Sequence, residues 1–195
     1  SDDPSGPCSA VSDPMTLTIN TAATATAGSD ATICAGSTST LSGTRGGSAS
    51  SSTWTTSGTG TFDDASLVGA LYTASSADIS AGSVVLTITT DDPSGPCAAA
   101  ADAMTLTINA VAVVSAGSDD ATCAGSAFTA SGSRSGGASS STWSTSGTGT
   151  FADNTLLAAV YTPSSADISA GSVVLTILSD DPSGPCSAVS DPMTL

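Results

Sequence analysis

The sequence predicts an all-β fold made of tandem antiparallel β-sandwiches, and three observations carry this prediction. Residues 1–89 and 90–178 agree at 61 of 89 positions without a gap. Several short segments alternate apolar and polar side chains, as half-buried strands do. Ser and Thr together make up 68 of the 195 residues, which suits the outward faces of many strands.

A longer period lies behind the first. The segment SDDPSGPCSAVSDPMTL at 1–17 returns unchanged at 179–195, whereas the copy at 90–106 is altered. A full unit of 178 residues made of two alternating domains explains this pattern.

The repeat predicts the domain organisation. We expect residues 1–20 to be the C-terminal part of a preceding repeat and residues 21–109 to form one sandwich. Residues 110–195 form the second sandwich, with its last strand cut by the end of the chain.

Alternation and turn residues predict the elements of one repeat. The expected strands are 22–27, 37–42, 52–57, 67–73, 83–90 and 104–109. Within 83–90, Val84, Leu86 and Ile88 are expected to face the core. Residues 75–82 are expected to form a single helical turn in which Asp78 binds local backbone amides.

A unit of 89 residues with about seven short strands has the size of an immunoglobulin-like domain. Trp54 and Trp143 lie where such sandwiches bury a tryptophan. Core packing is therefore favoured for both over the alternative, stacking on a sugar.

The narrow composition excludes several functions. The chain has no His, Lys, Glu or Gln; its only bases are Arg45 and Arg134, and its net charge is −15. A Ser nucleophile would have no His or Lys to activate it, and a phosphate backbone would be repelled. No apolar run is long enough for a membrane span, and no signal peptide opens the chain. We expect no enzyme, no cofactor, no nucleic-acid binding and no membrane span.

The sequence also resembles a known type of repeat. The segments that carry the resemblance are AGSDATICAGSTSTLSG, STWTTSGTGTF, LYTASSADISAGSVVLTITTDDPSGPC and MTLTIN. Together they resemble the tandem Ig-like, PKD-like repeats of large secreted bacterial surface proteins and adhesins, over essentially the whole chain. The resemblance implies an extracellular, stalk-like or fibrous protein of many domains.

Five cysteines occupy two repeat positions, Cys8, Cys97 and Cys186 at one and Cys34 and Cys123 at the other. Two cysteines in each small domain predict disulfides and an oxidising compartment. We favour the intradomain pairs Cys34–Cys97 and Cys123–Cys186. However, a seven-residue strand spans about 23 Å, whereas a disulfide needs about 4.4–6.8 Å between Cα atoms. Cys34–Cys186, a staple across the domain joint, therefore stays open as the alternative.

Two further sets of side chains are candidate sites. Acidic pairs open the long connection in each repeat and are candidate calcium ligands, although turn formation is the favoured role: Asp91, Asp92, Asp180 and Asp181. Hydroxyl side chains in the Ser/Thr-rich surface are candidates for O-linked sugar: Ser50, Ser51, Ser52 and Thr53.

We expect a structural function, as a repeat of an extracellular bacterial filament or adhesin stalk. Its partners would be further copies of the repeat, end to end, together with surface glycans. One alternative is a carbohydrate- or protein-binding module of a secreted protein, with Trp54 or Tyr72 exposed. Another is a pilin-like subunit that donates residues 1–20 as a strand to its neighbour.

Overall fold

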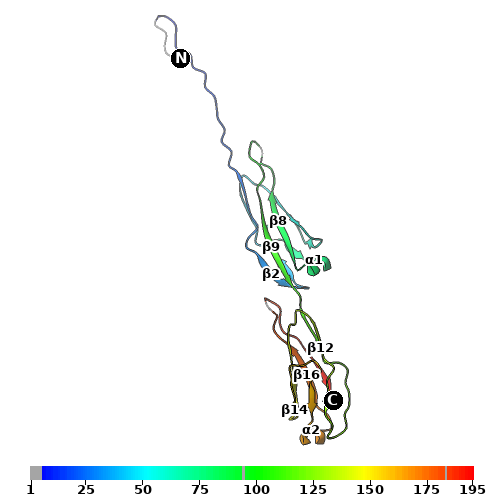
Figure 1. Cartoon of the computed structure of the whole chain (residues 1–195). Helices are drawn as coiled ribbons and strands as arrows, with labels where there is room; N and C mark the ends of the chain where they lie inside the picture. The colour runs from blue at the N-terminus through cyan, green and yellow to red at the C-terminus, as the bar shows by residue number, and fades with distance from the viewer. Residues whose placement is uncertain (1–5, 94, 183) are drawn as a thin grey trace.

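The computed structural model of the chain describes residues 6–93, 95–182 and 184–195. Two β-sandwiches are stacked end to end, and an extended segment reaches away from the first of them (Figure 1). We call residues 21–109 the N-domain, residues 110–195 the C-domain and residues 6–20 the tail. Of the segment predicted at 1–20, residues 1–5 lie outside the described part.

The N-domain is built from short strands and one helical turn. In order, its elements are β1 (Ala23–Thr26), β2 (Ala31–Cys34), β3 (Thr38–Thr40), β4 (Thr44–Gly47), β5 (Ser52–Thr56), β6 (Thr61–Phe62), β7 (Leu71–Thr73), α1 (Ser76–Ala81), β8 (Ser83–Thr90) and β9 (Ala101–Asn109). The main sheet has the order β2-β9-β8-β5, and β3-β7-β6 forms the second. β1 pairs with β4.

The C-domain repeats this plan. Its elements are β10 (Ala112–Ser115), β11 (Phe128–Thr129), β12 (Ser133–Gly136), β13 (Ser141–Thr145), β14 (Thr150–Phe151), β15 (Val160–Thr162), α2 (Ser165–Ala170), β16 (Val174–Ser179) and β17 (Ser190–Thr194). The sheets are β13-β16-β17 and β11-β15-β14, with β10 paired to β12. The all-β tandem sandwich is confirmed.

Side-chain alternation along β8 builds the core of the N-domain. Val84, Leu86 and Ile88 are buried, as expected, and Ile88 lies opposite Trp54 in the β5–β8 register. Apolar side chains that point to one face of a strand pack between the two sheets and leave water together. Trp54 is 2% exposed, so its predicted core position is confirmed.

The same burial overturns one alternative. Trp54 and Tyr72 are both buried, as are their counterparts Trp143 and Tyr161. A binding module that displays Trp54 or Tyr72 was therefore the wrong expectation. These aromatic rings hold the sandwich together and are not available to a ligand.

Three N-domain strands lie outside the predicted ranges: β2, β4 and the two-residue β6. β4 lies within 43–51, where Gly-rich composition predicts a loop; it pairs with β1 through its backbone and buries little side chain. β2 runs parallel to β9, whereas the sandwich was expected to be antiparallel throughout. Its partner is distant in sequence, so no hairpin signal marks it. The strand expected at 67–73 covers only Leu71–Thr73.

The helical turn α1 is anchored by the buried carboxylate of Asp78, as the sequence predicts. Ser75 caps the helix, and Asp78 completes a capping box with it. The carboxylate also accepts hydrogen bonds from the Thr59 backbone at 3.0 Å and the Tyr72 hydroxyl at 2.8 Å. Burial alone would raise the pKa of Asp78, but the donors from Ser75, Thr59 and Tyr72 outweigh it and lower the pKa to about 2.

The core accounts for a first prediction. Leu86→Ala removes a fully buried side chain and should lower the free energy of unfolding of the N-domain by about 2–5 kcal/mol. Val85→Ala, on the exposed face of the same strand, should change it by about 0.5 kcal/mol or less. Urea unfolding followed for each domain by two-dimensional NMR measures both. Equal losses would contradict the assignment of faces.

Asp78 accounts for a second prediction, a pH dependence. Because the folded pKa lies below the ordinary value of 3.8, the carboxylate stabilises the fold above that value. This contribution is lost as the pH falls toward about 2. Asp78→Asn replaces one acceptor oxygen by a donor and should lower the free energy of unfolding of the N-domain by about 1–3 kcal/mol at pH 7. It should also flatten the decline of that free energy between pH 4 and pH 2.

Asp92→Asn is the matched control, since Asp92 is exposed. It should keep the wild-type pH profile in the same urea titrations. An Asp78→Asn profile as steep as that of the wild type would show that the acid lability arises elsewhere.

Candidate functional site

The joint between the two domains is the candidate functional site, because the β2 and β9 strands of the N-domain both end there. β9 leaves the N-domain at Asn109 and β10 starts at Ala112, so the connection is very short. Because β2 runs parallel to β9, with Cys34 in register with Asn109, both strands end at this same pole. The parallel pairing therefore carries Cys34 to the joint.

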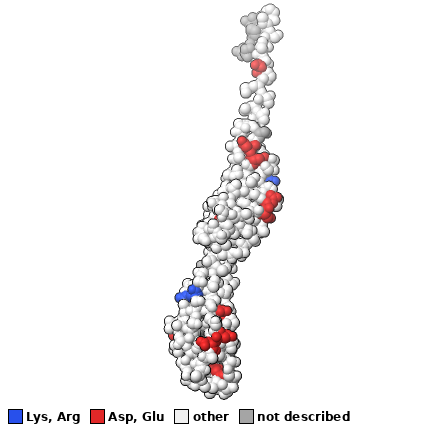
Figure 2. All heavy atoms as spheres, turned by 90° about the vertical axis from the view of Figure 1, so that its right-hand side faces the viewer, with Lys and Arg blue, Asp and Glu red and all other residues white. Residues whose placement is uncertain are grey.

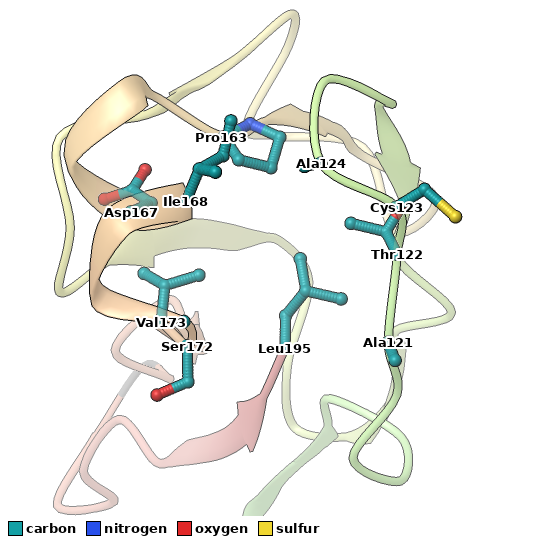
Figure 3. A pocket seen from close by; sticks show the side chains of 11 residues that line it. Ala121, Thr122, Cys123, Ala124, Pro163, Asp167, Ile168, Ser172, Val173 and Leu195 are labelled. Carbon is teal, nitrogen blue, oxygen red and sulfur yellow. The ribbon is translucent and has the colours of Figure 1, made fainter.

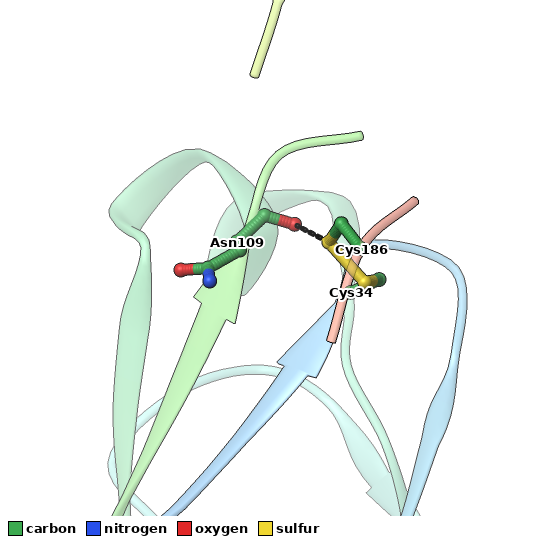
Figure 4. Close-up of a disulfide and its surroundings, with 3 residues drawn as sticks. All are labelled: Cys34, Asn109 and Cys186. Carbon is green, nitrogen blue, oxygen red and sulfur yellow. Dashed lines mark hydrogen bonds between the residues drawn. A yellow bond between two sulfur atoms is a disulfide. The ribbon is translucent and has the colours of Figure 1, made fainter. Parts of the chain in front are cut away.

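The C-domain supplies the other cysteine. The connection between β16 and β17 brings Cys186 to the joint, where it forms a disulfide with Cys34 (Figure 4). The two Cα atoms are 5.4 Å apart, and the bond joins residues 152 apart in sequence. The Asn109 carbonyl oxygen lies 3.8 Å from Sγ of Cys186. A disulfide sulfur has no proton to donate, so we interpret this as a polar contact.

Gly184 lets the connection approach Asn109 closely. Its φ is +94°, a conformation that side chains with a Cβ rarely adopt. A Cβ on Gly184 would lie 2.4 Å from Nδ2 of Asn109, inside contact distance. The backbone conformation therefore favours glycine here, and a Cβ would in addition displace the Asn109 side chain.

The favoured disulfide pairs were wrong. The structure pairs Cys34 with Cys186, the alternative connectivity, in place of Cys34–Cys97 and Cys123–Cys186. Cys97 lies at the opposite pole of the N-domain from Cys34, beside Asn20, and the connection that carries it does not fold down the sheet to close the distance. Cys8, Cys97 and Cys123 are free thiols.

The outer pole of the N-domain reproduces half of the joint. Sγ of Cys97 lies 3.6 Å from the Asn20 carbonyl oxygen, as Cys186 lies beside that of Asn109. Gly95 has φ +109°, and a Cβ there would lie 2.4 Å from Nδ2 of Asn20, the distance found at Gly184. The repeat thus builds the same cradle of Asn, Gly and Cys at both positions.

The acidic candidate Asp91 forms hydrogen bonds to a neighbouring loop. Asp91 accepts hydrogen bonds from the backbone amides of Ser50 and Ser51 at 2.9 and 3.0 Å and from the Ser50 hydroxyl. The side-chain hydrogen bond from Ser50, followed by that from the Ser51 amide, lowers the pKa of Asp91. Each donor fills a lone pair that a cation would need, which favours the turn role.

The equivalent carboxylate behaves alike. Asp180 accepts from the backbone amide of Ser139 at 3.0 Å and from its hydroxyl, which is the first cause of its lowered pKa. Asp92 and Asp181 are exposed. Within residues 6–93, 95–182 and 184–195, no three acidic or cysteine side chains are grouped so that they could hold a metal ion. Calcium binding by these residues, the less favoured role in the sequence analysis, stays untested.

The candidate sugar sites differ in accessibility. Ser50, Ser51 and Thr53 are exposed, but the Ser50 hydroxyl is bound to Asp91. Ser52 was the wrong candidate: it is buried, and its hydroxyl accepts from Nη1 of Arg45 at 3.3 Å. Ser51 and Thr53 keep their places as predicted attachment sites.

Charge is distributed along the rod. Figure 2 shows acidic side chains in patches on the visible face of both domains, with few basic atoms among them. None of the helices in the described part of the chain has the length and apolar character that a membrane crossing requires.

Comparison with known proteins yields fold neighbours only. No protein-family model and no curated protein sequence matches the chain. The solved structures it resembles include human cadherin-23 EC21–23, with 16% identity, a TM-score of 0.48 and coverage of 90% of this chain and 63% of that one. Mouse cadherin-23 EC22–24 is 15% identical with a TM-score of 0.46, and the match covers 90% of this chain and 66% of that one. Drosophila N-cadherin EC1–4 is 14% identical with a TM-score of 0.45, and the match covers 90% of this chain and 49% of that one.

The chain thus spans about two thirds or less of the length of these solved chains. At this identity and superposition, no property of cadherins transfers to it. The fold class follows from the sheet arrangement of the chain itself, two sheets packed face to face in each domain. The chain is a tandem of Ig-like β-sandwiches. The narrower resemblance to bacterial PKD-like repeats remains a prediction.

The two arginines make the disulfide directly testable. Trypsin can cut only after Arg45 and Arg134, giving fragments 1–45, 46–134 and 135–195. After denaturation and thiol alkylation without reduction, fragment 1–45 should be linked to fragment 135–195, with 46–134 released alone. Mass spectrometry reads the result. A fragment 1–45 that is not linked to 135–195 would contradict the joint, whereas the Cys34–Cys97 pairing predicts a link from 1–45 to 46–134 in its place.

Proposed function

We propose that the chain is a structural repeat of an extracellular stalk or filament, in which successive Ig-like domains are stapled at their joints. The observation that carries the proposal is the Cys34–Cys186 disulfide between two consecutive domains. A disulfide inside one domain would stabilise that domain only, whereas this one restrains how the domains sit on each other.

The position of the disulfide also suits a protein under tension. A pull on the two ends enters through β1 and β2, crosses from Cys34 to Cys186, and leaves through β17. Residues 35–185, between the two cysteines, contain most of both hydrophobic cores and lie outside this path. The covalent bond therefore bears the load that would otherwise unfold the sandwiches.

Composition supports an extracellular location. Disulfides persist mainly in oxidising compartments. With no Lys and two Arg, the chain presents few sites to trypsin-like proteases, and its net charge of −15 favours solubility. A bacterial filament or an adhesin stalk, the setting that the sequence resemblance implies, is the form of this function we favour.

Single-molecule force spectroscopy tests the proposal. The oxidised chain, pulled from its ends, should release only the short segments outside the disulfide loop. Under reducing conditions, or with Cys34→Ser, the contour length should increase by about 50 nm more, since about 152 residues join the extensible chain at about 3.3–3.6 Å each.

Cys8→Ser is the control, because Cys8 is an exposed free thiol in the tail. It should keep the short extension of the oxidised wild type. Equal extension with and without reductant would overturn the stapled stalk.

A further inference from the structure

The two sulfurs of the joint disulfide have different surroundings. Cys186 is 4% exposed, whereas Cys34 is only partly buried. Cys34 is the last residue of β2, and β2 is the outermost strand of the main sheet, so this cysteine lies at an edge of the N-domain. A reagent in solution therefore reaches Cys34 more readily than Cys186.

Strand alternation directs the Cys34 side chain outward. Ile33 packs against the core, and neighbouring side chains of a strand point to opposite faces. The equivalent pair in the second repeat has the same orientation: Figure 3 shows Thr122 pointing into a cavity of about 170 Å³ and the Cys123 sulfur pointing away from it. The repeat thus places this cysteine position on the outer surface.

The approach to Cys186 is also blocked in the direction that thiol exchange requires. A thiolate attacks one sulfur of a disulfide in line with the sulfur–sulfur bond, from the side that faces away from the other sulfur. Figure 4 shows the Asn109 carbonyl oxygen on that side of the Cys186 sulfur, and the two atoms are 3.8 Å apart. An electron-rich oxygen in this place leaves no room for an incoming thiolate and repels its charge.

Two glycines show how much room each side of the disulfide offers. A Cβ on Gly184, two residues before Cys186, would lie 2.4 Å from Nδ2 of Asn109. A Cβ on Gly36, two residues after Cys34, would meet nothing within 4 Å. The connection that carries Cys186 is therefore pressed against the N-domain, while the turn after Cys34 is open.

We propose that the joint disulfide is a modification site for small thiols, which attack Cys34 and not Cys186. The products are a mixed disulfide on Cys34 and a free thiol at Cys186. The proposal rests on the stapled stalk proposed above, and it names the class of reagent that opens the joint.

The exchange is balanced without any further oxidant or reductant. The incoming thiolate forms a bond to Sγ of Cys34, the bond between Cys34 and Cys186 breaks, and Cys186 leaves as a thiolate that takes a proton from water. One disulfide is lost and one mixed disulfide is gained. In the reverse step, Cys186 attacks Cys34, expels the small thiol and closes the joint again.

The short linker favours this reverse step. β9 ends at Asn109 and β10 starts at Ala112, so only residues 110–111 lie between the two domains. A short tether gives Cys186 a high effective concentration at Cys34 after the bond has opened. The concentration of small thiol around the stalk therefore sets the fraction of joints that are open.

Trapping of the mixed disulfide tests the site of attack. In the Cys8→Ser chain, Cys34 is the only cysteine of fragment 1–45, and Cys186 is the only one of fragment 135–195. The oxidised chain is exposed briefly to free cysteine, quenched with acid and treated with N-ethylmaleimide, which blocks free thiols. After trypsin digestion, mass spectrometry should find the added cysteine on fragment 1–45 and the maleimide on fragment 135–195.

The opposite labelling would overturn the proposal, as would equal amounts of the two products. The same experiment in urea is the matched control. In the unfolded chain neither burial nor the Asn109 carbonyl distinguishes the two sulfurs, so the added cysteine should be found on Cys34 and Cys186 in comparable amounts. A preference for Cys34 that is as strong in urea as in the native chain would show that the fold does not cause it, and would also overturn the proposal.

The stalk proposal fails separately. If fragments 1–45 and 135–195 are not linked before free cysteine is added, the staple itself is absent and both proposals fall. If they are linked and the added cysteine is found on Cys186, the staple stands and only the site of attack is wrong.

Discussion

The parallel pairing of β2 with β9 is the constraint on which the rest of the structure depends. It places Cys34 and Asn109 side by side at one pole, where the next domain begins. In an antiparallel pair the two chain ends would point to opposite poles, and Cys34 would be a sandwich length from Cys186. From this one pairing follow the staple across the joint and the proposed path of force through the chain.

The sequence foretold the elements that bury a regular face. β8 was predicted over its full length because Val84, Leu86 and Ile88 alternate with polar residues, and Trp54 was placed in the core for its position in the repeat. α1 was predicted from its Ser and Asp capping residues. Where burial has a period, local sequence carries the information.

It missed what depends on backbone pairing between distant segments. β4 buries almost nothing, so its Gly-rich sequence resembles a loop. β2 is four residues long and gains its order from β9, about 75 positions away. The intradomain pair was preferred because the long connection 91–103 was expected to fold down along the sheet edge and bring Cys97 to Cys34, whereas Cys97 lies beside Asn20 at the other pole. The cradle of Asn and Gly had a signal, the identical repeat spacing of Asn20, Asn109, Gly95 and Gly184, whose meaning depends on three dimensions.

The restricted amino-acid composition also has a physical explanation. Aspartate is nearly the whole charge of the chain, and the described carboxylates with ordered partners hold loops, helix ends or strand ends through backbone amides, as Asp78, Asp91 and Asp191 do. Hydroxyl residues supply much of the remaining polar bonding. The proposed stalk function would draw its stability from the repeated cores and from the disulfide at the joint.

The central claim is that one disulfide makes the two domains a single rigid body, and residual dipolar couplings measure this most directly. In the oxidised chain, amides of β8 and β16 should fit one alignment tensor. In the Cys34→Ser, Cys186→Ser double variant they should need two tensors of different magnitude. Two different tensors in the oxidised chain would contradict the claim.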